Sequence, residues 1–140
     1  MKDLRPALRA FLLADADIAA AVGSSRAFPV VLPQEQNGQT SIVYTRISGR
    51  GDHHMQGPSG LDRVRVQVDA WAVEPDAADE LARAVKARLD GYLGPMPMDG
   101  SPPVEVTVQG VFLDSARDDY DSNAKMHRVS QDFMIWFEER

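Results

Sequence analysis

Cysteine is absent from this chain of 140 residues. Without thiols the protein can form no disulfide bond and offers no thiolate ligand to a metal ion. Long apolar runs are absent too, since none approaches the roughly 20 residues that a membrane-spanning helix requires. The N-terminus lacks the continuous apolar stretch of a signal peptide. The sequence therefore predicts a protein without disulfide bonds and without membrane contact.

Positive charge is scarce as well. Lys and Arg number 15 against 21 Asp and Glu, which leaves a formal net charge of −6 at pH 7. A general nucleic-acid binder needs a basic face to displace counterions from phosphates, so the balance disfavours that class while leaving room for a local basic patch. The hydrophobic content of 44% and the charged content of 26% are ordinary for a soluble globular protein. The length fits a single domain spanning residues 1–140.

Helical periodicity predicts a helix near the N-terminus and a second one after the middle of the chain. The first apolar stripe consists of Leu4, Leu8, Phe11 and Leu12. Asp15 or Asp17 is suited to cap a further short helix that ends at Gly23. The helix after the middle begins near Pro75, and its apolar residues repeat every four positions. These residues are Leu81, Val85 and Leu89.

Alternating apolar and polar residues predict strands over residues 42–47, 63–69, 104–113 and 127–137. Residues 27–32 contain a proline and end before another, which favours an edge strand. Residues 94–103 hold four prolines and two glycines and are expected to form a loop, as is the acidic stretch 114–125. We expect an α+β fold, with a mostly antiparallel sheet of about four to five strands and with an N-terminal helix and a second helix packed on it.

The polar, glycine-rich stretch from residue 48 to 61 joins the two central strands. It is too long for a tight hairpin turn, and long connections in small domains are usually functional or disordered. We therefore expect a mobile loop that contacts a large partner.

Few residues suggest chemistry. Asp52, His53 and His54 are adjacent, but neighbouring side chains on a strand point to opposite faces, so solvated loop residues are the favoured interpretation. Asp119, Asp121 and Asn123 imitate the start of a calcium loop, but Ala124 and Ser130 stand where it needs glycine and a bidentate glutamate. No nucleotide-binding or nucleophile motif is present. We expect no enzymatic activity, no cofactor and no metal.

The chain resembles the tail completion proteins of long-tailed bacteriophages, also called tail terminator or head-to-tail joining proteins. The resemblance follows an ordered set of short segments over nearly the full length. These are Ala7-Leu8, Ala14-Asp15, Phe28-Pro29, Leu32-Pro33, Ile42-Val43-Tyr44, Asp52-His53-His54, Gly57-Pro58-Ser59-Gly60, Val64-Arg65-Val66-Gln67-Val68-Asp69, Leu89-Asp90-Gly91-Tyr92, Tyr120, and Arg128-Val129-Ser130-Gln131-Asp132-Phe133 with Trp136.

The resemblance implies an α+β subunit of a ring, usually sixfold, that caps the tail tube beneath the head connector. Its partners would be other copies of itself, the tail tube protein and the head connector or stopper protein, with DNA passing through unbound. It would be assembled in the host cytoplasm and reside in the virion, at the head–tail interface of a phage, a prophage or a gene transfer agent.

Two sets of residues are candidates for these contacts. We expect the loop after the first central strand to touch the partner through Arg50, Asp52, His53, His54, Met55 and Gln56. We expect the acidic connection to face the ring's lumen and repel DNA through Asp114, Asp118, Asp119 and Asp121.

Two other classes of protein remain compatible with the sequence. One is a small enzyme or ligand-binding α+β domain with a site around Asp52, His53 and His54, which a bound metal or a deep pocket would favour. The other is a regulatory binding module, which a closed dimer with a basic face would favour.

Overall fold

The computed structural model describes residues 4–54, 57–98 and 104–138. In chain order the elements are α1 (Arg5–Leu13), α2 (Ala16–Val22), β1 (Ala27–Pro29), the 3₁₀ helix η1 (Gln34–Gln36), β2 (Ser41–His54), β3 (Gly57–Ala72), α3 (Pro75–Leu89), β4 (Gly94–Met98), β5 (Val104–Asp121) and β6 (Met126–Glu138). None of the helices in these ranges is long and apolar enough to cross a membrane.

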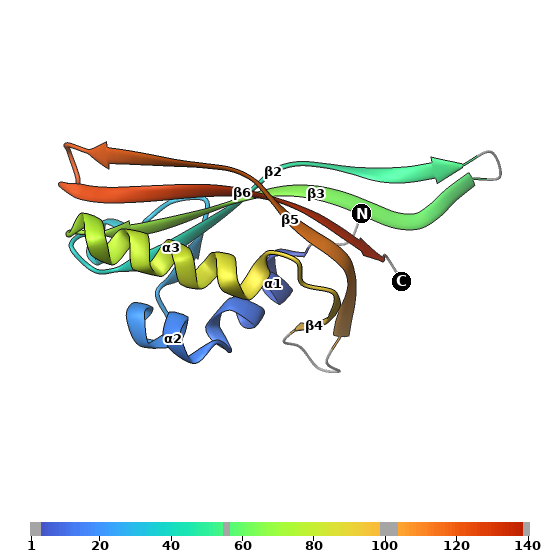
Figure 1. The fold of residues 1–140 in the computed structure, drawn as a ribbon, viewed down its shortest axis with the longest axis horizontal. Helices are drawn as coiled ribbons and strands as arrows, with labels where there is room; N and C mark the ends of the chain where they lie inside the picture. Colours follow the sequence, from blue (N-terminus) through green and yellow to red (C-terminus); the bar gives the residue numbers. More distant parts are fainter. Residues whose placement is uncertain (1–3, 55–56, 99–103, 139–140) are drawn as a thin grey trace.

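The strands form one sheet with the order β1-β2-β3-β6-β5-β4, and α1, α2 and α3 lie on one side of it (Figure 1). Neighbouring strands run antiparallel except for β1 and β2, which are parallel. We call the side without helices the open face. The expected α+β class and the mostly antiparallel sheet are confirmed.

The helices follow the predicted signals. The carboxylate of Asp15 caps α2, accepting hydrogen bonds from the backbone N–H groups of Asp17 at 2.9 Å and Ile18 at 3.2 Å. Gly23 ends this helix in the left-handed conformation, with φ of 64°, which glycine adopts without steric penalty. Pro75 lies in the first turn of α3. The further short helix expected before Gly23 is thus confirmed as α2, and the described residues contain three α-helices.

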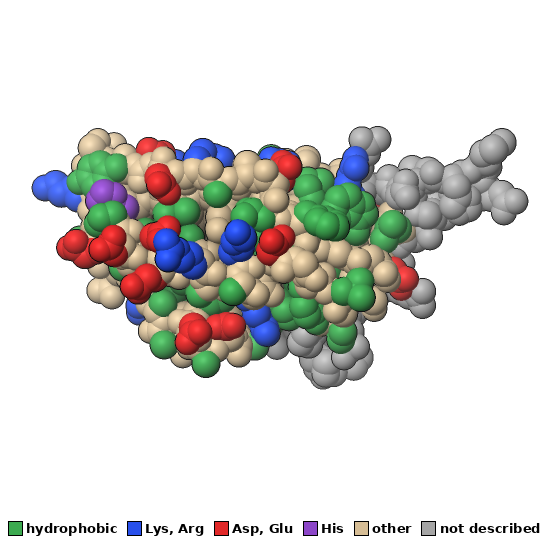
Figure 2. Space-filling model, viewed as in Figure 1, with side chains coloured by type: hydrophobic (Ala, Val, Ile, Leu, Met, Phe, Trp, Pro, Cys, Tyr) green, Lys and Arg blue, Asp and Glu red, His purple; other side chains and the backbone are tan. Residues whose placement is uncertain are grey.

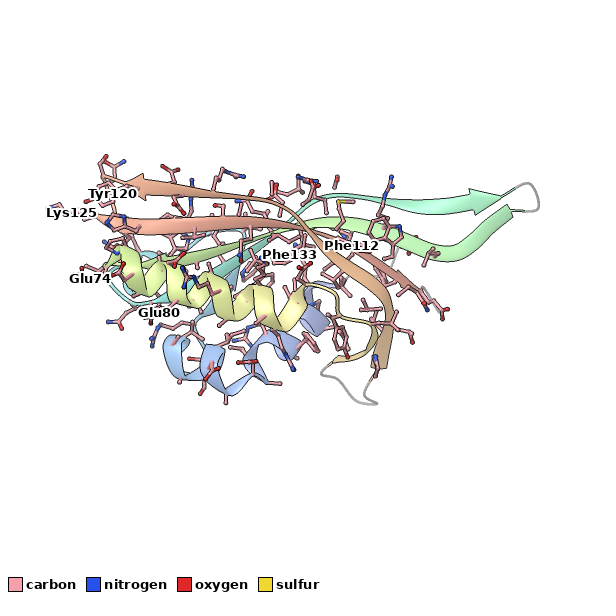
Figure 3. The ribbon with its side chains drawn as sticks, in the orientation of Figure 1. Glu74, Glu80, Phe112, Tyr120, Lys125 and Phe133 are labelled. Carbon is pink, nitrogen blue, oxygen red and sulfur yellow. The ribbon has the colours of Figure 1, made fainter. Side chains whose placement is uncertain are left out.

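The core fills the space between the helices and the inner face of the sheet. The valines at positions 64, 66 and 68 of β3 alternate toward it, as do Phe133, Ile135 and Phe137 of β6. The buried faces of α1 and α3 complete this cluster. Figure 3 shows Phe133 between the sheet and α3.

The sheet has six strands in the described residues, against the four to five expected. The proline-rich stretch predicted as a loop begins with β4, which pairs with residues 104–108 of β5. Pro95 and Pro97 are compatible with this strand because it is an edge strand, where alternate N–H groups point away from the ladder. Met96 lies between them and is fully buried, so a core contact holds the strand in place.

Two predicted loops were also wrong. The connection 48–61 is not a loop: β2 continues to His54 and β3 begins at Gly57, with His54 paired to Gly57. The register shifts at bulges between Arg46 and Ser48 and between Gly51 and His53. The antiparallel pairing continues on both sides of each bulge. Likewise the acidic stretch 114–125 is mostly strand, because β5 runs to Asp121 and only a short turn precedes β6.

We expect Asp15→Ala to lower the free energy of unfolding by about 1 kcal/mol, because two backbone N–H groups at the start of α2 lose their acceptor. Chemical denaturation with fixed slope measures the change. Asp17→Ala is the matched control, since Asp17 is exposed in the first turn of the same helix and caps nothing. Equal losses for the two variants would contradict the assigned cap.

Candidate functional site

Along each strand, every second side chain points away from the core and lies on the open face. On β3 these are Arg63, Arg65, Gln67, Asp69 and Trp71. In register with them on β6 stand Trp136, Met134, Asp132, Ser130 and Arg128. Although no helix covers this face, several of its polar residues are nearly inaccessible, with Asp69 at 5% exposure and Asp132 at 8%. Side-chain contacts across the strands therefore shield them.

Arg65 connects three strands on this face. Its guanidinium donates to the carboxylate of Asp114 on β5 at 2.5 Å and to that of Asp132 on β6 at 3.0 Å. These bonds raise the pKa of Arg65 above its ordinary value, the bond to Asp114 contributing most. Ser115 also donates to Asp132 at 3.3 Å. Arg65 of β3 thus pairs across the sheet with carboxylates of both β5 and β6.

A second group of contacts continues along the same face. Arg117 of β5 donates to the amide oxygen of Gln67 at 3.1 Å, and Gln67 donates to Asp69 at 2.8 Å. Farther along, Arg128 binds the carboxylate of Asp119, which also accepts the backbone N–H of Tyr120. The Tyr120 N–H first and Arg128 second lower the pKa of Asp119. The charges on this face therefore largely neutralise one another.

A pocket of about 410 Å³ opens on the same face, near the end of the molecule where β5 turns into β6. We call it the Trp71 pocket. Its apolar part includes Val31, Leu32 and Val43 beside the indole of Trp71, and its polar part includes Asn123 and Arg128. Trp71, Val43 and Met126 form a second small hydrophobic cluster, separate from the main core. The pocket therefore lies over a rigid, buried floor.

The rim of the Trp71 pocket combines a strained backbone conformation with exposed apolar side chains. Val30 has φ of 68°, an outlier for a β-branched residue that costs on the order of 1–3 kcal/mol. A hydrogen bond of 3.0 Å from its N–H to the carbonyl of Tyr44 fixes this conformation. Val30 is 55% exposed and Val31 66% exposed. Two adjacent valines are thereby held out in solvent.

Another apolar patch lies on the open face, near the base of the hairpin. Phe112 is 58% exposed and packs edge-to-face on Trp136, with ring centroids 5.4 Å apart. Met134 stands beside Phe112 in register. Figure 2 shows hydrophobic side chains gathered at this part of the surface.

The β2–β3 hairpin extends past the body of the molecule (Figure 1). We call its outer part, residues 47–63, the arm. The parallel strand β1 covers only Ile42–Tyr44 of β2. In the part of the chain that the structure describes, the outer edge of β2 from Thr45 to His54 has no neighbouring strand. Such an edge is a template for pairing with another chain.

The predicted contact residues are placed only in part. Arg50, Asp52, His53 and His54 belong to β2 within the arm, but their side chains are not described. Met55 and Gln56 lie outside the described residues. These residues therefore share one projecting hairpin, and their contact with a partner stays a prediction.

The four predicted lumen-facing carboxylates lie along the end of β5. Asp114 and Asp119 are ion-paired with Arg65 and Arg128. Asp121 accepts the backbone N–H groups of Asn123 and Ala124, the Asx turn favoured over calcium binding from the sequence. Among the described residues, Asp118 has neither a hydrogen bond nor an ion pair. Within the same part of the chain, no three His, Asp or Glu side chains are grouped as metal ligands.

The Trp71 pocket is the feature that the sequence interpretation missed. A signal was present, because Trp71 occupies the polar phase of β3, after Asp69 and opposite the valines. A large aromatic residue in that phase indicates a second apolar contact surface. The adjacent valines after Pro29 are a second signal of an apolar surface.

Comparisons with known proteins agree with one another. A family model described as tail completion protein gp17 matches residues 6–138. Among solved structures, a chain of the virion of a native gene transfer agent particle is similar, with a TM-score of 0.73 and 19% sequence identity over 96% of this chain and 94% of that one. No curated protein sequence matches at a significant level.

We expect Arg65→Gln to destabilise the fold by about 1–3 kcal/mol, because it leaves the nearly buried carboxylate of Asp132 without its main donor. Urea denaturation gives the value. Arg63→Gln, on the same face and strand, serves as the control, since no ion pair of Arg63 is found among the described residues. A loss for Arg63→Gln as large as that for Arg65→Gln would exclude a specific role for the three-strand contact.

Proposed function

The chain belongs to the tail completion protein gp17 family, and we propose that it forms a ring that caps the tail tube and joins it to the head connector. Family membership makes it a structural protein of a phage-type tail. The ring and its two junctions are our proposal. The observation that supports a ring is the arm. It projects from one end of the subunit, so the opposite end of the sheet can contact the arm of another copy.

Geometry favours a head-to-tail ring over a two-fold dimer. The arm extends from one end of the long axis, whereas the β5–β6 turn, marked by Tyr120 and Lys125, lies at the other (Figures 1 and 3). A contact between unlike surfaces repeats from copy to copy and closes into a ring when the rotation allows. We propose six copies, as the family resemblance implies.

The partners follow from this arrangement. A ring at the end of a tail has one side toward the tube protein and the other toward the head connector or stopper. The open face provides a surface for such a contact at the exposed aromatic ring of Phe112, whereas the arm is left for the neighbouring copy in the ring. We propose a purely structural role without catalysis, because the charged side chains of the open face are engaged with one another rather than with an open site.

We predict that the protein forms closed rings of six at high concentration or on isolated tails, and that the arm is required. Asn-Gly in place of residues 52–61 would close the hairpin on the Gly51–Asp62 pair, because this dipeptide favours a tight turn. This variant should keep its thermal unfolding midpoint within a few degrees and lose ring formation. Mass measurement and negative-stain imaging are the assays.

The control is Ser59→Ala, which keeps the arm length, replaces none of the predicted contact residues and should still form rings. A stable two-fold dimer of the unaltered protein, with the arm buried in it, would exclude the proposal. Rings formed by the shortened variant would show that the arm is dispensable.

We propose further that Asp114, Asp118, Asp119 and Asp121 face the lumen, with DNA passing through unbound. The ion pairs of Asp114 and Asp119 reduce the negative potential that these two residues contribute. Asp118 is therefore the residue that tests the proposal best. The unaltered ring should show no DNA binding at low salt, where attraction is strongest. Asp118→Arg introduces one cation per subunit and should make rings retain DNA in a filter-binding assay.

Asp17→Arg is the control for this charge change, because Asp17 is exposed on α2, away from the acidic end of β5. It should leave DNA binding unchanged. DNA retention by both variants, or by neither, would place Asp118 away from the lumen.

A further inference from the structure

The Trp71 pocket contains hydrogen-bond donors that lack acceptors. The indole Nε1 of Trp71 and the Nε of Arg128 are both buried without a partner among the described residues. Trp71 itself is only 8% exposed. Buried donors are normally paired, since leaving one unpaired costs roughly 1–3 kcal/mol. Together with the strained, exposed valines at the rim, they indicate a surface that is completed by another molecule.

The missing partner must present hydrogen-bond acceptors. The outer edge of β2 within the arm can supply them, because an unpaired strand edge carries free carbonyl groups. The arm cannot reach the pocket of its own subunit, since the two lie at opposite ends of the long axis (Figure 1). A second copy brings them together in a head-to-tail contact.

Charge agrees with this pairing. At the pocket end, the carboxylates of Asp118, Asp119 and Asp121 stand among the cations Arg117, Lys125 and Arg128, and Figure 2 shows side chains of both signs at this end. In the arm, Arg50 and Arg63 balance Asp52 and Asp62, and the adjacent histidines add positive charge when protonated. The arm therefore lacks the negative charge of the rest of the chain and is not repelled by the pocket end.

We propose that the Trp71 pocket receives the arm of the adjacent copy in the assembled ring. This inference rests on the proposed function and specifies the contact between neighbours. The arm's backbone carbonyls accept hydrogen bonds from Trp71 and Arg128, while Val31 and Leu32 on the rim pack against the same strand. Each subunit contributes one arm and one pocket, so the contact repeats without a free end when the ring closes.

The absence of cysteine allows a direct test by disulfide formation. Val31→Cys places a thiol on the pocket rim, and His54→Cys places one at the end of β2 in the arm. The double variant, oxidised under assembly conditions, should give a ladder of covalent oligomers on a non-reducing gel. An equal mixture of the two single variants should stop at the covalent dimer, because each subunit then has only one thiol.

Leu93→Cys combined with His54→Cys is the matched control. Leu93 is 68% exposed, like Val31, and does not line the pocket. This pair should give no ladder. A ladder of equal yield from the control, or none from Val31 with His54, overturns the proposed contact. If rings are seen by imaging but the ladder is absent, the ring function stands and only the contact fails; if neither appears, both fail.

Val31→Asp provides an independent measurement without cysteine chemistry. The side chain is exposed, so the monomer should unfold at the same temperature as the unaltered protein. A carboxylate on the rim should raise the concentration needed for ring formation about tenfold or more, the equivalent of roughly 1.4 kcal/mol. Leu93→Asp should leave that concentration unchanged. Unaltered assembly of Val31→Asp would contradict the contact.

Discussion

The pairing of β3 with β6 is the interaction on which the other elements depend. It runs without a register shift from Leu61 to Ala72, and each strand alternates between the core and the open face. Beneath it α3 packs against both strands. Above it the same register brings Arg65 within reach of Asp132 and places Trp71 beside Arg128. One ladder thus fixes the hydrophobic core and the polar surface together, because a one-residue slip would exchange the two faces.

The sequence predicted those parts of the fold that local patterns determine. Alternating valines located β3, the apolar period located α3, and Asp15 marked the start of α2. It failed where tertiary contacts override local preference. Pro95 and Pro97 favoured a loop, yet the segment forms an edge strand because Met96 between them is buried in the core. The glycines of residues 48–61 favoured a flexible connection. Instead the antiparallel pairing of β2 with β3, including its bulges, continues through this stretch.

The candidate site was less predictable than the fold for a physical reason. The Trp71 pocket joins the segment after β1, the C-terminal end of β3 and the β5–β6 turn, which are far apart in the sequence. Only the assembled sheet brings them together, and no spacing rule reports such a combination. The acidic residues of β5 show the opposite difficulty. Their charge was visible in the sequence, but the arginines that neutralise Asp114 and Asp119 come from other strands.

Covering only one face of the sheet with helices has consequences for assembly. A two-layer subunit of this kind leaves its open face and the outer edge of β2 without a covering layer in the described part of the chain, while the hydrophobic core lies on the helical side. Exposed edges and strained apolar rims are liabilities in a free protein. The bulges in β2 and the ion pairs on the open face limit non-specific pairing, because only a partner with matching register and acceptors gains from the contact.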